Sequence, residues 1–332
     1  MRALQQIAYG DPADVVKLIE LPDPEPAADE IVIAMEASAV HLADIHRFTG
    51  DEGSRNYQLP NQPGYEGVGR VTAVGSNVTS FKTGDRAFPW WRAGAFAEKV
   101  CAKAKDALPA PEGDPKQLAL MMVNGITSFC LLEDFADLKK SDWIIQNGAN
   151  SSCGRYLIVL AKERGVKTCN VVRRETLFDE LYALGADACV VDTGDANELA
   201  SRVSEATDGA DIPIGFDLAA GGATGRIARC LGDGGTVVNY GFISGEQCQI
   251  SFRDLSKKNI TLIGMSAWRG VAKRSQDEIR LTYAMLAEKM GSGELKAAIA
   301  GAYPLDQFKE AFAHAVRTGD DRKGKVILLP NG

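Results

Sequence analysis

The sequence contains few of the residues on which metal centres and disulfide scaffolds depend. It has three histidines and seven cysteines among its 332 residues. The two cysteines that lie closest together, Cys153 and Cys169, are sixteen positions apart, so no C-x-x-C pair occurs. This spacing argues against a zinc knuckle and against a thioredoxin-type redox motif. Scattered single cysteines are typical of small buried side chains in a reducing cytoplasm, where we expect this protein.

Long apolar runs and an excess of basic residues are also missing. No apolar run reaches the ~18–20 residues that a membrane helix needs, and the N-terminal stretch lacks the apolar core of a signal peptide. Lys and Arg number 37 against 44 Asp and Glu, which gives a net charge of −7. We therefore expect neither a membrane nor a nucleic acid among the partners of this chain.

Two styles of sequence are present instead. Up to about residue 110, short β-branched runs such as Ile31–Ala34 and Gly67–Gly75 alternate with turn signals, which is typical of an antiparallel barrel or rolled sheet. From about residue 117, strand-like and helical runs alternate, and this predicts an α/β fold with a doubly wound parallel sheet. We expect strands at 143–145, 166–172, 188–191, 212–216, 235–240 and 260–265, and helices at 155–164, 176–184 and 198–206.

The tail of the chain returns to a mixed pattern. An amphipathic stretch runs from 276 to 290, and Lys325–Leu329 is expected to be a closing strand. A β-rich start, a nucleotide-binding middle and a mixed tail predict a discontinuous first domain, made of residues 1–117 and 267–332. The Rossmann-like unit, residues 118–266, is then inserted into this domain, and we expect the functional cleft between the two.

The first strand of the middle unit ends in a loop of small and polar residues, Gln146–Gly154, and a helix follows at once. Small residues let the backbone approach a pyrophosphate, and the helix N-terminus supplies N–H donors. The strict G-x-G-x-x-G motif is absent, although Gly148 stands at the position of its first glycine. A tight turn with Asn and Ser caps is the alternative. The candidate cofactor-binding residues here are Asn147, Gly148, Asn150, Ser151, Ser152, Cys153 and Gly154.

The second strand of this unit ends in two arginines, Arg173 and Arg174. An NAD-binding unit would place an acidic residue near this strand end to hold the ribose 2′-hydroxyl. A guanidinium suits a 2′-phosphate instead, so the pair favours NADPH over NADH, although Glu175 follows directly. A solvated basic pair at a strand end is the alternative.

Several motifs now resemble one family. Pro63–Val71, Val74–Val78 and Phe81–Arg86 are similar to segments of the medium-chain dehydrogenase/reductase superfamily, and the similarity spans essentially the whole chain. The resemblance implies a GroES-like catalytic domain, β-rich and discontinuous, wrapped around a Rossmann domain. It also implies dimers or tetramers joined through the last Rossmann strands, here about Ile260–Met265, and we expect a homodimer.

Within the superfamily, the zinc alcohol dehydrogenases carry a cysteine and a Gly-His-Glu element that hold a catalytic zinc. Here His41 falls where the first cysteine should be, and Tyr65 replaces the histidine. The four-cysteine structural zinc loop is missing as well. The resemblance therefore implies the zinc-independent branch and no bound metal. An unusual site made by His41, His46 and Glu66 stays open, and a metal analysis would detect it.

The phosphate loop narrows the resemblance further. Its Asn-x-x-Asn-Ser pattern in Asn147–Ser151 is similar to the loop of mitochondrial-type 2-enoyl thioester reductases. Val123–Phe129 resembles the segment whose threonine reaches the cofactor, and Gly234–Gly241 is shared more widely. The resemblance adds five candidate cofactor-binding residues: Asn124, Thr127, Tyr240, Gly241 and Phe242.

The enoyl thioester reductases place a tyrosine in the loop before the Gly-x-Glu-Gly element, where it stabilises the enolate oxygen. Tyr57 is the only tyrosine of the corresponding loop, residues 50–60, and Tyr65 is its rival for this catalytic role. The alternative is that neither tyrosine is catalytic and that both are packing residues. Candidate substrate-pocket residues are His41, Trp90, Trp91, Arg92, Trp268 and Arg269.

The leading hypothesis is thus an NADPH-dependent, zinc-independent reductase of an α,β-unsaturated acyl thioester, a small-molecule substrate. A reductase of quinones, enones or enals is the second. The third is a nucleotide-binding, crystallin-like protein that keeps the fold without the chemistry. Turnover with any acceptor separates the third hypothesis from the first two.

Overall fold

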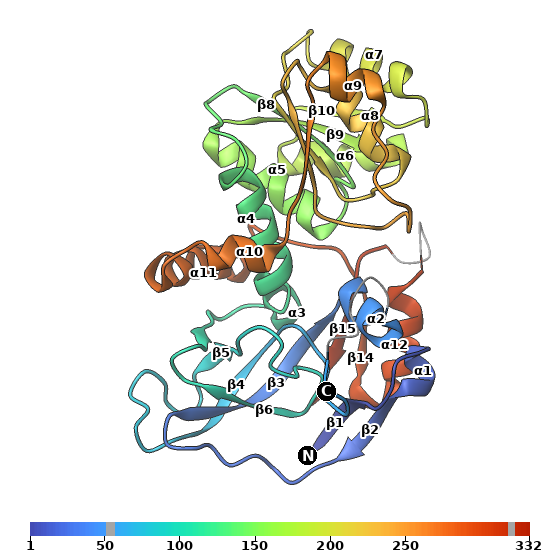
Figure 1. Cartoon of the computed structure of the whole chain (residues 1–332). Helices are drawn as coiled ribbons and strands as arrows, with labels where there is room; N and C mark the ends of the chain where they lie inside the picture. Colours follow the sequence, from blue (N-terminus) through green and yellow to red (C-terminus); the bar gives the residue numbers. More distant parts are fainter. Residues whose placement is uncertain (51–56, 318–322) are drawn as a thin grey trace. The chain divides into compact units, whose positions relative to one another are not determined.

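A computed structural model describes residues 1–50, 57–317 and 323–332. The chain divides into two compact units. In Figure 1 the chain is coloured along the sequence, from blue at the N-terminus to red at the C-terminus. Unit 1 consists of Met1–Val123 and Asp277–Gly332, and unit 2 of Asn124–Gln276. Unit 1 therefore contains both ends of the chain. The domains predicted from the sequence have their boundaries at 117/118 and 266/267. That these are the folding domains of the protein stays a prediction.

Unit 1 is built around one long strand, β3 (Glu30–Val40). Its Ile31, Ile33 and Met35 side chains are fully buried at alternate positions, as expected of a strand with one face on a core. The sheet has the order β14-β15-β3-β4-β5-β7, with β6 also on β3, and a separate pair joins β1 to β2. The other strands are β1 (Arg2–Gln6), β2 (Val16–Glu20), β4 (Gly67–Val74), β5 (Arg86–Phe88), β6 (Lys99–Lys103), β7 (Leu108–Pro109), β14 (Ile299–Pro304) and β15 (Lys325–Leu329).

The helix α2 (Leu42–Thr49) interrupts the β-rich part of unit 1. His41 is its N-cap, and the Asp44 carboxylate accepts the His41 backbone N–H at 2.9 Å, half of a capping box. Gly50, in the left-handed region with φ 75°, ends it. The remaining helical segments of this unit are α1 (Pro12–Val15), α3 (Pro115–Leu118), η3 (Leu305–Gln307) and α12 (Phe308–Ala315). The π-helical turn η1 (Met121–Gly125) and α11 (Gln276–Gly291) each contain one of the boundaries between the two units.

Unit 2 is a doubly wound parallel sheet with the strand order β10-β9-β8-β11-β12-β13. All five neighbouring pairs run parallel. The order of the strands reverses between β8 and β11, and ligands of such sheets bind at the carboxyl ends next to this reversal. The strands are β8 (Trp143–Asn147), β9 (Lys167–Val172), β10 (Ala188–Val191), β11 (Ile214–Asp217), β12 (Thr236–Asn239) and β13 (Thr261–Gly264).

Both faces of this sheet are covered, which explains its nearly continuous apolar strands. Val171 belongs to the core that includes Leu199 and Ile227, from one group of helices. Its neighbour Val172 belongs to the core that includes Ile158, from another group. The α-helices, labelled in Figure 1, are α4 (Ile126–Glu133), α5 (Ser152–Arg164), α6 (Phe178–Leu184), α7 (Ala196–Ala206), α8 (Gly222–Cys230), α9 (Phe252–Lys257) and α10 (Ala267–Ala272). The short 3₁₀-helix η2 (Glu175–Leu177) precedes α6.

The predicted fold class, an α/β protein with a doubly wound parallel sheet and a second, β-rich part, is confirmed. Over the described ranges, no helix is at once long enough and apolar enough to cross a membrane.

Candidate active site

The loop between β8 and α5 has the conformation that phosphate binding requires. Gly148 lies in the left-handed region with φ 64°, and a Cβ there would come within 2.8 Å of the Leu218 side chain. A Cβ on Gly154 would lie 2.6 Å from backbone atoms of Ala149. The Ser151 hydroxyl caps α5 by accepting the Gly154 N–H at 3.1 Å. The first turn of α5 therefore faces a close backbone cradle, with N–H groups that have no partner inside the helix.

A buried carboxylate fixes the strand ends around this loop. Asp217, at the end of β11, is fully buried. Its Oδ1 accepts the Asn147 side-chain N–H at 2.6 Å, and its Oδ2 accepts Thr224 Oγ1 at 2.6 Å and Asn239 Nδ2 at 3.0 Å. Asn147 in turn accepts the backbone N–H of Leu218 at 2.8 Å. The ends of β8, β11 and β12 are thus tied together, although sequence reasoning had singled out only Asn147 of these side chains.

The side chain of Asn124 is a second indication that a polar ligand fits here. Its Nδ2 donates to Cys153 Sγ at 3.2 Å, and Ser128 Oγ donates to the Asn124 carbonyl at 2.9 Å. Within the described part of the chain, its Oδ1 is buried and has no hydrogen-bond partner. An orphaned buried acceptor calls for a donor, and ribose hydroxyls and carboxamides supply one. Thr127, also buried, lies one helical turn further on α4. These residues fit a dinucleotide.

The predicted 2′-phosphate residues follow β9. Arg173 is exposed, and no hydrogen bond or ion pair joins its side chain to another described residue. Arg174 is half-buried and precedes η2. Tyr240, Gly241 and Phe242 follow β12 directly, and a Cβ on Gly241 would lie 2.5 Å from Leu218 atoms. All candidate cofactor-binding residues lie in unit 2, at or next to the carboxyl ends of its strands or in η1, α4 and α5.

Unit 1 brings the two candidate catalytic tyrosines together. The Tyr57 and Tyr65 hydroxyls are 3.1 Å apart, and both side chains are half-buried. Burial raises the pKa of Tyr65 far above its usual range, and the hydrogen bond to Tyr57 adds to the rise. Tyr65 is therefore a protonated donor at any ordinary pH. The residues 51–56 of the predicted loop lie outside the described part of the chain.

The adjacent tryptophans Trp90 and Trp91 both contact Tyr283 of the helix α11. Trp91 Nε1 donates to the Tyr283 hydroxyl of α11 at 3.0 Å, and the Trp90 ring meets the Tyr283 ring edge-on with centroids 6.1 Å apart. Arg92 places its guanidinium carbon 5.4 Å from the ring centroids of both Tyr57 and Tyr65. Of the predicted substrate-pocket residues, Arg92 thus contacts the tyrosine pair, whereas Trp90 and Trp91 contact Tyr283 of α11.

His41 lies in a buried polar chain with Glu66, which the sequence analysis had grouped with it as a possible metal site, and with Lys325, which it had not singled out. Lys325 Nζ donates to His41 Nδ1 at 3.1 Å, and His41 Nε2 lies 2.5 Å from Glu66 Oε1. Because an ammonium group has only donors, Nδ1 is the acceptor and Nε2 carries the proton toward Glu66. The Val123 backbone N–H donates to Glu66 Oε2 at 2.9 Å.

Two buried carboxyl groups, Glu66 in this polar chain and Asp44 nearby, hold their protons unusually tightly. Burial raises the pKa of Glu66 to about 8, and the nearby Lys325 ammonium opposes this rise. Burial likewise raises the pKa of Asp44 to about 7, against the His41 backbone N–H and the Arg47 guanidinium. Desolvation of the charged form is the dominant cause in both. Both groups therefore change charge near neutral pH.

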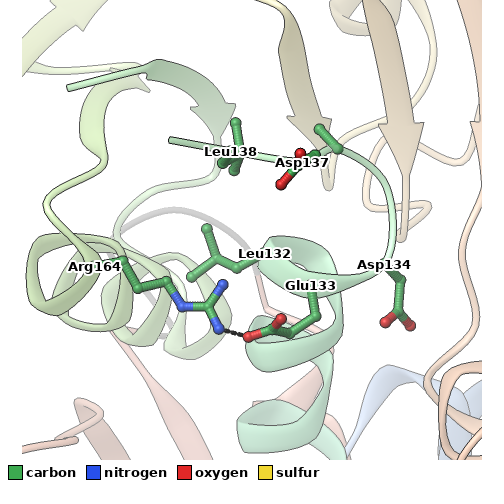
Figure 2. A pocket seen from close by; sticks show the side chains of 7 residues that line it. Leu132, Glu133, Asp134, Asp137, Leu138 and Arg164 are labelled. Atoms are coloured by element: carbon green, nitrogen blue, oxygen red, sulfur yellow. Dashed lines mark ion pairs between the residues drawn. The ribbon is translucent and has the colours of Figure 1, made fainter. Parts of the chain in front are cut away.

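The remaining candidates, Trp268 and Arg269, are exposed on α10 of unit 2. Unit 2 also has an open hollow, which Figure 2 shows from close by. Leu132, Glu133, Asp134 and Arg164 are among the residues that line it, and Arg164 forms an ion pair with Glu133. None of the predicted site residues lines this hollow, so it is no part of the candidate site.

Comparisons with known proteins agree with this geometry. Residues 27–112 match the family described as "Alcohol dehydrogenase GroES-like domain", and residues 153–284 match "Zinc-binding dehydrogenase". The mitochondrial enoyl-[acyl-carrier-protein] reductase of Caenorhabditis elegans is 33% identical over 305 residues, which cover 89% of this chain and 86% of the relative. The chain belongs to the medium-chain dehydrogenase/reductase superfamily, in its enoyl reductase type.

Other relatives of this medium-chain reductase support the assignment. The enoyl-[acyl-carrier-protein] reductase of Bos taurus is 31% identical, covering 93% of this chain and 83% of its own. A solved Bacillus thuringiensis protein described as an NADPH:quinone reductase is 26% identical with a TM-score of 0.88, over 99% of this chain and 98% of that one. A mycobacterial protein solved with NADPH is also 26% identical, with a TM-score of 0.84, over 99% and 100%.

The polar chain around His41 stands where the resemblance placed the zinc ligands of related enzymes. Among the residues that the structure describes, no group of three or more His, Cys, Asp or Glu side chains could hold a metal ion. In this medium-chain reductase His41 instead lies between an ammonium group and a carboxyl group.

The buried Asp44 gives the medium-chain reductase a measurable pH dependence of stability. Its folded pKa of about 7 lies above the ordinary value of 3.8, so the folded chain binds this proton more tightly than the unfolded chain. The stabilisation is complete below the ordinary value and is lost as the pH rises to about 7. We expect the free energy of unfolding to fall across this window, with a slope that Asp44→Asn reduces by up to about 1.4 kcal/mol per pH unit.

Urea unfolding at several pH values across this window measures the effect. Asp14→Asn, at an exposed position of the same unit, is the matched control and should leave the slope as it is. Equal slopes in wild type and Asp44→Asn would show that the buried carboxyl does not hold its proton as described.

Proposed function

We propose that this protein is an NADPH-dependent reductase of the activated C=C bond of an α,β-unsaturated acyl thioester. The observation that carries the proposal is the hydroxyl pair of Tyr57 and Tyr65, 3.1 Å apart and half-buried in unit 1. The relatives named enoyl-[acyl-carrier-protein] reductase support it, because they align over most of both chains.

The cofactor would be held by residues of unit 2. The cradle at Gly148 and Gly154 and the first turn of α5 suit the pyrophosphate. The orphaned Asn124 oxygen suits a hydroxyl or amide donor, and the exposed Arg173 suits a 2′-phosphate. When bound, NADPH supplies a hydride to the β-carbon of the substrate.

The tyrosine pair would stabilise the negative charge that develops on the thioester oxygen. One hydroxyl hydrogen is used between Tyr57 and Tyr65, and the other is left to donate to that oxygen. Preorganised donors of this kind act on the charge of the transition state, so they raise kcat. Since Tyr65 holds its proton at any ordinary pH, the donation should persist over a wide pH range.

Reduction of a quinone is the second candidate function. The aromatic cluster of Trp90, Trp91 and Tyr283 favours it, since flat rings stack on such side chains. The Bacillus thuringiensis neighbour described as an NADPH:quinone reductase supports the same possibility.

A homodimer joined through β13 is part of the proposal. This strand lies at one edge of the unit 2 sheet, and all four of its residues are exposed. Leu262 and Ile263 are 39% and 38% exposed there. Such exposure is unusual for an apolar strand at the edge of a sheet unless another subunit covers that edge. We also place the protein in a reducing compartment, the cytoplasm by our prediction, because all seven cysteines are free thiols. The curated relatives are named mitochondrial, so fractionation of the source cells decides the compartment.

Turnover with a panel of acceptors tests the function. Crotonyl-coenzyme A should be reduced with oxidation of NADPH, at a higher kcat/KM than a quinone or a simple enone. Loss of the hydroxyl in contact with substrate, Tyr57→Phe or Tyr65→Phe, should lower kcat about 10²- to 10³-fold, as for the loss of one oxyanion donor. Turnover of quinone alone would overturn the leading function, and unchanged rates in both variants would overturn the mechanism.

The cofactor preference has its own test. Arg173→Ala should weaken NADPH binding at least about ten-fold, since a charge-assisted contact with the 2′-phosphate is lost. NADH binding should hardly change, because NADH lacks this phosphate. Fluorescence titration measures both affinities, and Arg202→Ala on the exposed face of α7 controls for the loss of one positive charge. Equal weakening of both cofactors would refute the role of Arg173.

The dimer is tested at its proposed edge. Ile263→Lys puts a charge on β13 and should shift the mass in sedimentation equilibrium from dimer to monomer. Leu281→Lys is the matched control, because Leu281 is 72% exposed on α11 in the other unit. A wild-type monomer, or a dimer that tolerates Ile263→Lys, would exclude this interface.

A further inference from the structure

Arg47 is a buried cation for which the described residues provide no acidic partner. It lies in the last turn of α2 and is 3% exposed. Its Nη2 donates to Asn61 Oδ1, while its Nε is buried without a hydrogen-bond partner in the described part of the chain. Asp44 lies three positions earlier on the same helix, and the Arg47 charge opposes the rise of its pKa, but the two side chains form no ion pair. A buried charge in this state is strongly destabilising unless an anion meets it in the working protein.

The Arg47 guanidinium lies against the tyrosine pair. Its carbon is 4.0 Å from the centroid of the Tyr57 ring, a close cation–π contact. Arg92 is the second cation here, 5.4 Å from the centroids of the Tyr57 and Tyr65 rings. Two guanidinium groups therefore face two phenols whose hydroxyls are hydrogen-bonded to each other.

The position of Arg92 carries a conformational cost. Its φ of 60° lies in the left-handed region, which is uncommon for a residue with a long side chain. The Arg92 backbone N–H donates to the Tyr65 carbonyl oxygen at 2.9 Å, and this bond supports the strained turn beside the phenols. Strain of this kind is concentrated at functional sites.

We propose that Arg47, assisted by Arg92, is the positive partner of the enolate that forms at the tyrosine pair. This inference rests on the proposed function. A hydride from bound NADPH, which is left as NADP⁺, forms the new C–H bond at the β-carbon, and the π electrons of the C=C bond move to give the enolate oxygen. The phenol pair donates to that oxygen, and the guanidinium groups stabilise its charge through the rings. The α-carbon then takes a proton from water, which completes the saturated thioester.

Arg47 acts through Tyr57, so it is a positioning residue, and its test needs a measurement other than turnover. Acetoacetyl-coenzyme A is a suitable probe, because its enolate has its own ultraviolet absorbance and forms without any cofactor. Titration of the bound probe against pH gives the ratio of enolate to keto form. The wild type should favour the enolate over the ratio in free solution.

Matched variants separate charge from packing. Arg47→Gln should lower the enolate ratio of the bound probe about ten-fold, and Arg47→Lys should keep most of it because the charge remains. Arg92→Gln should lower it less, and it provides the answer if the buried variants do not fold, because Arg92 is exposed. Arg70→Gln, at a half-buried ion-paired position in the same unit, should leave the ratio unchanged.

The outcomes are distinct from those for the proposed function. An enolate ratio that is unchanged in Arg47→Gln and Arg92→Gln overturns this inference, as does a wild type that gives no enolate excess. Equal losses in Arg47→Lys and Arg47→Gln would mean that Arg47 only packs. The proposed function itself fails in another assay, if the wild type does not reduce crotonyl-coenzyme A.

Discussion

The buried carboxylate of Asp217 is the interaction on which the cofactor side of this protein depends. A charge at a fully buried position is stable only when donors surround it, and here side chains from the ends of two neighbouring strands and from the following helix supply them. The same bonds that satisfy the charge fix the carboxyl ends of β8, β11 and β12. The phosphate loop begins where Asn147 ends, and Tyr240 follows Asn239 directly. Compensation of one charge thus positions two separate groups of candidate binding residues.

The buried charged groups of unit 1 have fewer hydrogen-bond donors and ionic partners than Asp217 has donors. Glu66 and Asp44 are buried with few donors, and burial raises the pKa of these groups to about 8 and about 7. Arg47 has no acidic partner among the described residues. A stable scaffold has no need of such groups, since apolar side chains of the same size cost less to bury. Asp217 of unit 2 is surrounded by donors, whereas Asp44 and Arg47 of unit 1 each keep one buried polar atom without a hydrogen-bond partner in the described part of the chain. Groups perturbed in this way are concentrated at functional sites.

The strands of unit 2 and three of its helices, α5, α6 and α7, could be predicted because their signals are local, whereas α4, α8, α9 and α10 were not predicted. Strand 188–191 has the predicted bounds, and the loop at Gly148 was found from its small residues and the helix that follows. The helix α2 was missed within a β-rich stretch, although Asp44 in its first turn and Gly50 at its end are capping signals. The contacts of Lys325 with His41 and of Arg47 with Tyr57 could not be predicted, since no periodicity records which distant side chains meet. The site residues themselves stay predictions until variants are measured.

The pairing of β15 with β3 has a consequence for biosynthesis. Val326 pairs with Val40, and Lys325 contacts His41 across 284 positions of sequence. All strands of unit 2 have been synthesised once residue 264 is added, whereas the unit 1 sheet lacks β14 and β15 until synthesis is nearly complete. Domains generally fold in the order in which they are made, and distant pairings form slowly. Unit 2 can therefore fold during translation, and the polar chain around His41 forms only when the last strand arrives. A premature stop before Lys325 would leave all strands of the unit 2 sheet in place, whereas the unit 1 sheet would lack β15 and the Lys325–His41 contact would be missing.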